Sequence, residues 1–163
     1  MMNYLGGLSH LAALAVCLVI GVCAGCGGGA ERPAEKTPET GAVRVTFTGL
    51  RNAEGQLLVN LFDGAEGFPD KSDRALRTKR VPADREPLEV SFDGLPHGAY
   101  AVSVVHDENA NDRLDRGRLG IPKEGYGASR NPATRFGPPE YSDAAFELKE
   151  SERTVEIELR YLL

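Results

Sequence analysis

Residues 95–104 read Leu-Pro-His-Gly-Ala-Tyr-Ala-Val-Ser-Val, a turn followed directly by a strand pattern. Pro and Gly are typical of tight turns, because Pro fixes φ and Gly tolerates conformations that other residues avoid. The apolar residues Tyr100, Val102 and Val104 then alternate with smaller ones. Successive side chains on a strand point to opposite faces, so this alternation predicts a β-strand with one face toward a core.

The same alternation recurs on both sides of this strand. The clear segments are residues 43–47, 57–61, 88–92 and 155–161, and the weaker ones are 76–81 and 144–148. The turn sequence Asn-Ala-Glu-Gly at 52–55 joins the first two segments as a hairpin. No amphipathic helix and no internal repeat is evident. Short alternating strands separated by Gly and Pro turns predict one antiparallel sandwich in residues 42–163.

The pattern LPxGxYxVxV at residues 95–104 resembles a strand of transthyretin-like and carboxypeptidase-regulatory-like sandwiches. In those domains the Gly permits the turn and the Tyr packs at a sheet corner. The resemblance therefore implies an all-β, immunoglobulin-like or transthyretin-like β-sandwich. We expect about seven antiparallel strands and one long ordered loop.

The first 25 residues predict export. They contain no Asp, Glu, Lys or Arg, and the apolar run at 11–24 is too short to span a bilayer comfortably. The run ends in Cys23-Ala-Gly-Cys26, where small residues precede a Cys as they do at a lipoprotein signal peptidase site. The chain thus resembles a bacterial lipoprotein with Cys26 as its acylated N-terminus. Cleavage by an ordinary signal peptidase near Ala24 is the alternative.

Residues 26–41 are rich in Gly, Pro and charge, and they predict a flexible tether between a lipoprotein signal peptide (1–25) and the sandwich (42–163). The expected location is outside the cytoplasm, with the lipid in the cell membrane or outer membrane and the domain facing the periplasm or cell surface. The residue after Cys26 is Gly27 rather than Asp, which resembles Gram-negative lipoproteins that are sent on to the outer membrane. All three cysteines lie in the leader, so the mature domain has no disulfide and no thiolate metal site.

Oxygen-bearing residues follow the strand at 99–105 with the spacing of a calcium loop. The expected ligands are the side chains of Asp107, Asn109, Asn111 and Asp115, the backbone carbonyl of Arg113, and Glu124 or Glu140 folding back. Together they would supply roughly the six oxygens that Ca²⁺ requires. The sequence therefore predicts a calcium-ordered loop.

This loop departs from a standard EF-hand. Asp112 stands at the sixth position, where Gly usually makes the turn, and Arg118 stands at the twelfth, where a bidentate Glu belongs. No amphipathic helix precedes the loop either. The alternative interpretation is that these Asp and Asn residues form turns by bonding to the nearby backbone.

A longer set of motifs covers most of residues 42–163. They include HDENxN from His106, Leu-Asp at 114–115, and LGIPxEGYG from Leu119. Together they resemble a bacterial family of exported proteins catalogued as a domain of unknown function. The resemblance implies an exported, sandwich-like domain and no particular activity. Asp112 replaces the family's usual Gly, and Ala128 replaces its usual Phe.

Reactive groups for an enzyme are few. His97 and His106 bracket one extended strand, at roughly 3.3 Å per residue, so they cannot share a zinc ion. An envelope-polymer hydrolase using His106, Asp107 and a neighbouring carboxylate such as Glu108 is the alternative function. The net charge of −5 and the scattered basic residues argue against nucleic acid, and Gly27-Gly-Gly29 lacks the context of a nucleotide phosphate loop.

The segment 107–143 is long for a loop in a compact domain, so something must order it. Besides an ion, the candidates are apolar side chains that pin it to the sandwich: Leu114, Leu119, Ile121, Tyr126, Phe136 and Tyr141. We expect this loop to bind an envelope protein or a glycan. The predicted function is a non-enzymatic, membrane-tethered binding or structural module of the cell envelope.

Overall fold

The structure, a computed structural model, describes residues 39–84, 88–133 and 137–162. The predicted leader and most of the tether, including Cys26, lie outside the described residues. Contacts divide the chain into units 1–35 and 36–163, and the second contains every described strand. No helix in the described part of the chain is long and apolar enough to cross a membrane.

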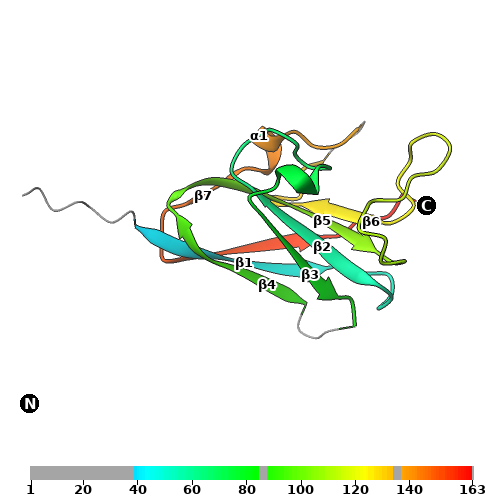
Figure 1. Cartoon of the computed structure of the whole chain (residues 1–163), viewed down its shortest axis with the longest axis horizontal. Helices are drawn as coiled ribbons and strands as arrows, with labels where there is room; N and C mark the ends of the chain where they lie inside the picture. Colours follow the sequence, from blue (N-terminus) through cyan, green and yellow to red (C-terminus); the bar gives the residue numbers. More distant parts are fainter. Residues whose placement is uncertain (1–38, 85–87, 134–136, 163) are drawn as a thin grey trace, which may run out of the picture. The chain divides into compact units, whose positions relative to one another are not determined.

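Two β-sheets form the domain (Figure 1). The smaller sheet has the order β4-β1-β8, with β4 at Glu89–Pro96, β1 at Thr40–Thr48 and β8 at Glu152–Glu158. The larger has the order β3-β2-β5-β6, with β3 at Arg77–Pro82, β2 at Gln56–Phe62, β5 at Gly98–Asp107 and β6 at Gly125–Ala128. A short β7 at Phe146–Leu148 pairs with β5. The prediction of an all-β sandwich is confirmed.

One pairing differs from the expected antiparallel pattern. β1 and β8 run parallel, from Ala42 opposite Glu152 to Thr48 opposite Glu158. All the other strand pairs are antiparallel. Alternation predicts which face of each strand lies in the core. It does not determine which strand pairs with it or whether the two run parallel, so the sequence pattern did not reveal this pair.

The main core lies between the sheets and uses the alternating residues. Val43, Val45 and Phe47 of β1 are buried in one cluster with Tyr100, Val102 and Val104 of β5. The hydroxyl of Tyr100 donates to the carbonyl of Pro96 at 2.7 Å, four residues earlier. The phenol thus fastens the start of β5 to the turn before it, as a corner tyrosine does.

The outer face of the larger sheet is covered over part of its area. Ala101 of β5 and Ala128 of β6 are buried there with Ala144 of α1, a short helix at Tyr141–Ala144. The Phe68 ring packs edge-to-face on the Phe62 and Tyr141 rings, with centroids 5.3 and 5.9 Å apart. The remaining part of this face, over β5 and β6, is open.

The segment 107–143 is more regular than predicted. It contains β6 and α1, together with an isolated antiparallel bridge between Arg116 and Pro122. β6 reads Gly-Tyr-Gly-Ala, which has too little alternation to identify it as a strand. Residues 114–122, which this bridge closes, form an arm that projects from the sandwich (Figure 1).

Candidate functional site

The end of β5 is closed by a tight polar turn around Asp107. This carboxylate is fully buried. Its Oδ1 accepts the amide of Asn111 at 2.9 Å, and its Oδ2 accepts the amide of Asp112 at 2.7 Å and the Gln56 Nε2 at 3.0 Å. Asp112 adopts a φ of 65°, the left-handed conformation that Gly favours at this position. Its own carboxylate accepts the Arg80 Nε at 2.7 Å, which offsets part of that cost.

Glu124 lies at the same turn. Its side chain is 4 % exposed, and its carboxylate accepts the amide of Glu108 at 3.2 Å and the amide of Asp115 at 2.8 Å. Glu140 stands at the N-terminus of α1 instead. The carboxylate of Glu124 therefore joins the beginning of the turn to its end.

The three remaining predicted side-chain ligands, Asn109, Asn111 and Asp115, lie nearer the surface. Asn109 Nδ2 donates to Asp115 Oδ2 at 2.8 Å, and Asn111 Oδ1 accepts the amide of Arg113 at 3.1 Å. Hydrogen bonds from Asn109 and Asn111 hold the pKa of Asp115 below its ordinary value. The predicted side chains thus form one hydrogen-bonded turn.

The predicted calcium site is not tested by this geometry. Within residues 39–84, 88–133 and 137–162, no group of three or more His, Cys, Asp or Glu residues is placed to hold a metal. The buried carboxylates of Asp107 and Glu124 accept backbone amides, as in the turn-forming alternative. Calcium binding therefore stays a prediction.

His106, the proposed acid or base of a hydrolase, is fully buried. Its Nε2 lies 2.8 Å from the carbonyl of Glu54, which can only accept, so Nε2 carries the proton. Its Nδ1 lies 2.7 Å from the hydroxyl of Tyr161, and in the neutral ring it accepts from that hydroxyl. Both ring nitrogens are therefore occupied, and His106 joins β5 to the turn at Glu54 and to the C-terminal segment.

An ion pair covers this histidine. Arg51 bonds both oxygens of Glu108 at 2.7 Å, and its guanidinium lies over the Tyr161 ring at 4.6 Å. The hydrogen bond from Arg51 is the largest cause that lowers the pKa of Glu108. The Glu108 carboxylate also lies 3.8 Å from His106 Nδ1. This network fixes the start of the polar turn to the rest of the sandwich.

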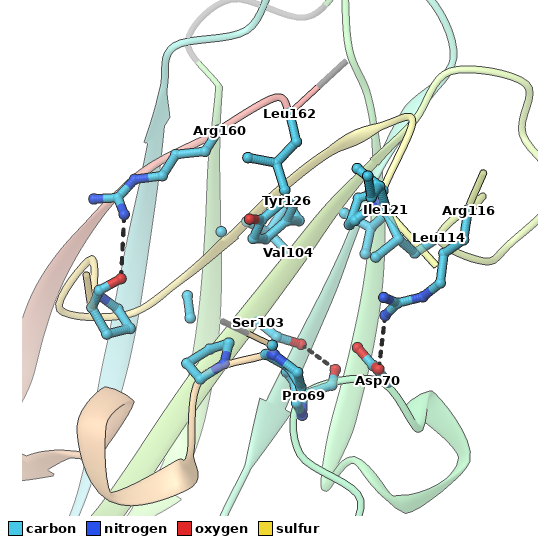
Figure 2. A pocket seen from close by; sticks show the side chains of 18 of the residues that line it. Pro69, Asp70, Ser103, Val104, Leu114, Arg116, Ile121, Tyr126, Arg160 and Leu162 are labelled. Carbon is cyan, nitrogen blue, oxygen red and sulfur yellow. Dashed lines mark hydrogen bonds and ion pairs between the residues drawn. The ribbon is translucent and has the colours of Figure 1, made fainter. Parts of the chain in front are cut away.

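A cleft of about 450 Å³ opens on the outer face of the larger sheet, beside the polar turn. Figure 2 shows its floor along Ser103 and Val104 of β5, with the Tyr126 side chain above them. The arm that carries Leu114 and Ile121 forms one wall. The opposite side is formed by the segments at 131–132 and 137–139 and by the C-terminal residues 158–162.

Two apolar residues of the arm do not pack against the sandwich as predicted. Leu119 is 86 % exposed and Ile121 is 36 % exposed, and both line the open cleft. They were expected to pack against the sandwich. Tyr141 does pack, against Phe68, and Phe136 lies outside the described residues. Apolarity predicts that a residue has a packing role but does not say whether the partner is the protein itself.

Charged side chains stand on opposite sides of the cleft (Figure 2). Arg116 of the arm is paired with Asp70 at 2.9 Å. Across the cleft, the guanidinium of Arg160 donates to the carbonyls of Pro132 at 3.3 Å and Asn131 at 3.4 Å. Glu158 also lines this side. The lining thus combines an apolar surface with two arginines, one of them bound only to carbonyls among the described residues.

Five polar residues of the cleft were not identifiable from the sequence: Asp70, Ser103, Arg116, Glu158 and Arg160. They come from four separate parts of the chain, since only Glu158 and Arg160 are close in sequence. Only the arm carried a signal, because exposed Leu and Ile beside Gly and Pro are unusual in a turn. No spacing rule brings the other four together.

Comparison with known proteins gives a family and no named relative. A family model described as "Uncharacterized protein conserved in bacteria (DUF2141)" matches residues 45–156. No curated protein and no solved structure matches the chain.

Proposed function

The chain belongs to the DUF2141 family of bacterial proteins, and from that premise we propose that it is an exported, lipid-anchored, non-enzymatic binding module of the cell envelope. Its ligand occupies the cleft on the outer face of the larger sheet. The cleft is the single observation that carries this proposal. Its volume of about 450 Å³ falls in the range of roughly 300–1,000 Å³ that is usual for ligand sites.

The exposed apolar residues support binding at this place. Leu119, Ile121 and Leu162 are 86, 36 and 56 % exposed, and all three line the same cleft. Single exposed apolar residues are ordinary, but a group around one hollow is typical of an interaction site. The arm would keep Leu119 and Ile121 in place before the ligand arrives, which lowers the entropic cost of binding.

The chemistry near His106 supports binding over hydrolysis. A general base must reach the proton that it removes. His106 is fully buried with both nitrogens bonded, and Asp107 is engaged by the turn. Among the described residues that line the cleft, the charged ones are Asp70, Arg116, Glu158 and Arg160, and none is a histidine.

The envelope location rests on Cys26 and the preceding small residues. Growth with labelled palmitate in a Gram-negative host tests it. The wild-type chain and the Cys23→Ala control should incorporate the label and sediment with membranes, and Cys26→Ala should do neither. An unlabelled wild-type chain would favour cleavage near Ala24 by an ordinary signal peptidase.

Binding in the cleft is tested with an isotope-labelled fragment of residues 36–163, the unit that contains the whole described core. NMR amide spectra would be followed during titration with peptidoglycan fragments, lipid micelles and envelope-derived peptides. At least one class should shift the signals of Ser103, Ile121 and Tyr126. Turnover of a polymer that is lost in His106→Ala, or no shift at the cleft with any class, would contradict the proposal.

A further inference from the structure

The ligand class of the cleft follows from its lining, and this inference rests on the proposed function. We propose that the cleft binds an amphipathic anion, a molecule with an apolar body and an oxyanion head group. The apolar body lies between the arm and the C-terminal segment. The head group pairs with Arg160.

The walls fit an apolar body. Ile121 of the arm and Leu162 of the C-terminal segment both lie next to Tyr126 in the cleft, Leu162 above it and Ile121 beside it in the view of Figure 2. Their exposed surfaces would leave water when a hydrocarbon chain enters, which is the main driving force for such binding. Glycans bind through many polar groups and aromatic faces, and Tyr126 is the only aromatic residue that lines the cleft in the described part of the chain.

Arg160 fits the head group. Its guanidinium makes two long hydrogen bonds to carbonyls and no ion pair with a described residue. A guanidinium has five N–H donors and binds carboxylate or phosphate through two of them at once. Donors therefore remain for an oxyanion, whereas Arg116 already holds Asp70.

The surroundings are cationic in a protein that is acidic as a whole. Residues 113–123 contain Arg113, Arg116, Arg118 and Lys123 against Asp115, a net charge of +3. The whole chain carries −5, so the other residues carry −8. This local excess attracts an anion to the cleft as a whole, and Arg160 on the facing side then pairs with the head group. Glu158 opposes it and weakens binding.

Isothermal titration of the 36–163 fragment tests the proposal with decanoate, decyl phosphate and decanol, all below their aggregation limits. The two anions should bind one to one, and decanol should bind about tenfold more weakly, because a hydrogen bond to a charged group is worth about that factor. Comparison of the two anions shows whether a carboxylate or a phosphate is preferred.

Three variants locate the two parts of the site. Arg160→Met should weaken decanoate binding to the level of decanol and leave decanol unchanged. Arg153→Met, on the same C-terminal strand region but outside the cleft lining, is the matched control and should change nothing. Glu158→Gln should tighten decanoate about twofold to fivefold, since a like charge is removed.

The outcomes separate the two proposals. Equal binding of decanol and decanoate, with no effect of Arg160→Met, would overturn the anionic ligand class and keep the cleft as an apolar site. Binding that survives Ile121→Asp unchanged would place the ligand elsewhere and overturn both proposals. If none of the three probes binds, the ligand class is wrong, and the titration with envelope components decides whether the cleft is a site.

Discussion

The hydroxyl of Tyr161 lies 2.7 Å from Nδ1 of His106, 55 residues earlier in the chain. The same hydroxyl accepts the amide of Arg51 at 3.2 Å. One phenol therefore ties the C-terminal segment to the end of β5 and to the turn before β2. The polar turn and the cleft depend on these three segments staying together.

Removing this hydroxyl should destabilise the fold. Tyr161→Phe leaves Nδ1 of a fully buried histidine without its partner, at a cost of about 1–3 kcal/mol. Urea unfolding should report that loss. Tyr126→Phe is the control, because the phenol of Tyr126 makes no hydrogen bond with any described residue. The free energy of unfolding of this variant should stay within about 0.5 kcal/mol of wild type. Equal losses in the two variants would contradict the role given to Tyr161.

Gly55 and Gly94 form a matched pair with φ of 67° and 66°. A Cβ on Gly55 would collide with the carbonyl of Asp107, whereas a Cβ on Gly94 meets nothing within 4 Å. Gly94→Ala should cost about 1 kcal/mol for its strained backbone, and Gly55→Ala clearly more. Thermal melting measures both. A Gly55→Ala variant as stable as Gly94→Ala would show that the Asp107 turn can move away without cost.

Low pH should lower the free energy of unfolding by weakening the Arg51–Glu108 ion pair over His106. The pKa of Glu108 is lowered, first by the hydrogen bond from Arg51, so its ionised form favours the folded state. That contribution is present above the ordinary Glu value of about 4.3 and is lost as the pH falls through the folded-state pKa. Unfolding measured from pH 6 to pH 3 should show a smaller decline for Glu108→Gln than for wild type. Parallel curves would refute the assignment.

The calcium prediction has its own test. If the turn at 107–115 binds Ca²⁺, added calcium raises the melting temperature, because the ion binds only the folded state. Of the predicted ligands Asp107, Asp115 and Glu124, Asp115 has the accessible carboxylate, with its side chain 31 % exposed. Asp115→Asn should then abolish the shift, and Asp143→Asn in α1 should keep it. A melting temperature that changes with neither added calcium nor chelator would contradict the prediction of a calcium site.

Local patterns predicted the strands better than their arrangement. Alternation at Val43, Val45 and Phe47 identified β1, and the residues are buried as expected. Alternation at 155–161 identified β8 as well, but its parallel pairing with β1 was not predictable, because the same alternation suits either direction. The strand β6 was missed since Gly-Tyr-Gly-Ala carries no pattern, and it forms by pairing with β5 and by a bridge from Tyr126 to Arg160.

The candidate site divides in the same way. The turn after β5 was visible in the sequence because Asp107, Asn111 and Glu124 act within a short stretch of chain. The cleft was not visible, because residues such as Asp70 and Arg160, which are 90 positions apart in the chain, line it together. Such a surface depends on tertiary packing, which no local spacing encodes.

Hydrogen exchange measured by mass spectrometry on the 36–163 fragment, with and without saturating decanoate, tests the central claim most directly. The account predicts slower exchange in the arm at 114–122 and in residues 126–132, with no change in β1 or β4. Unchanged exchange in the arm, with protection elsewhere or nowhere, would contradict the claim that the cleft is where this protein binds its ligand.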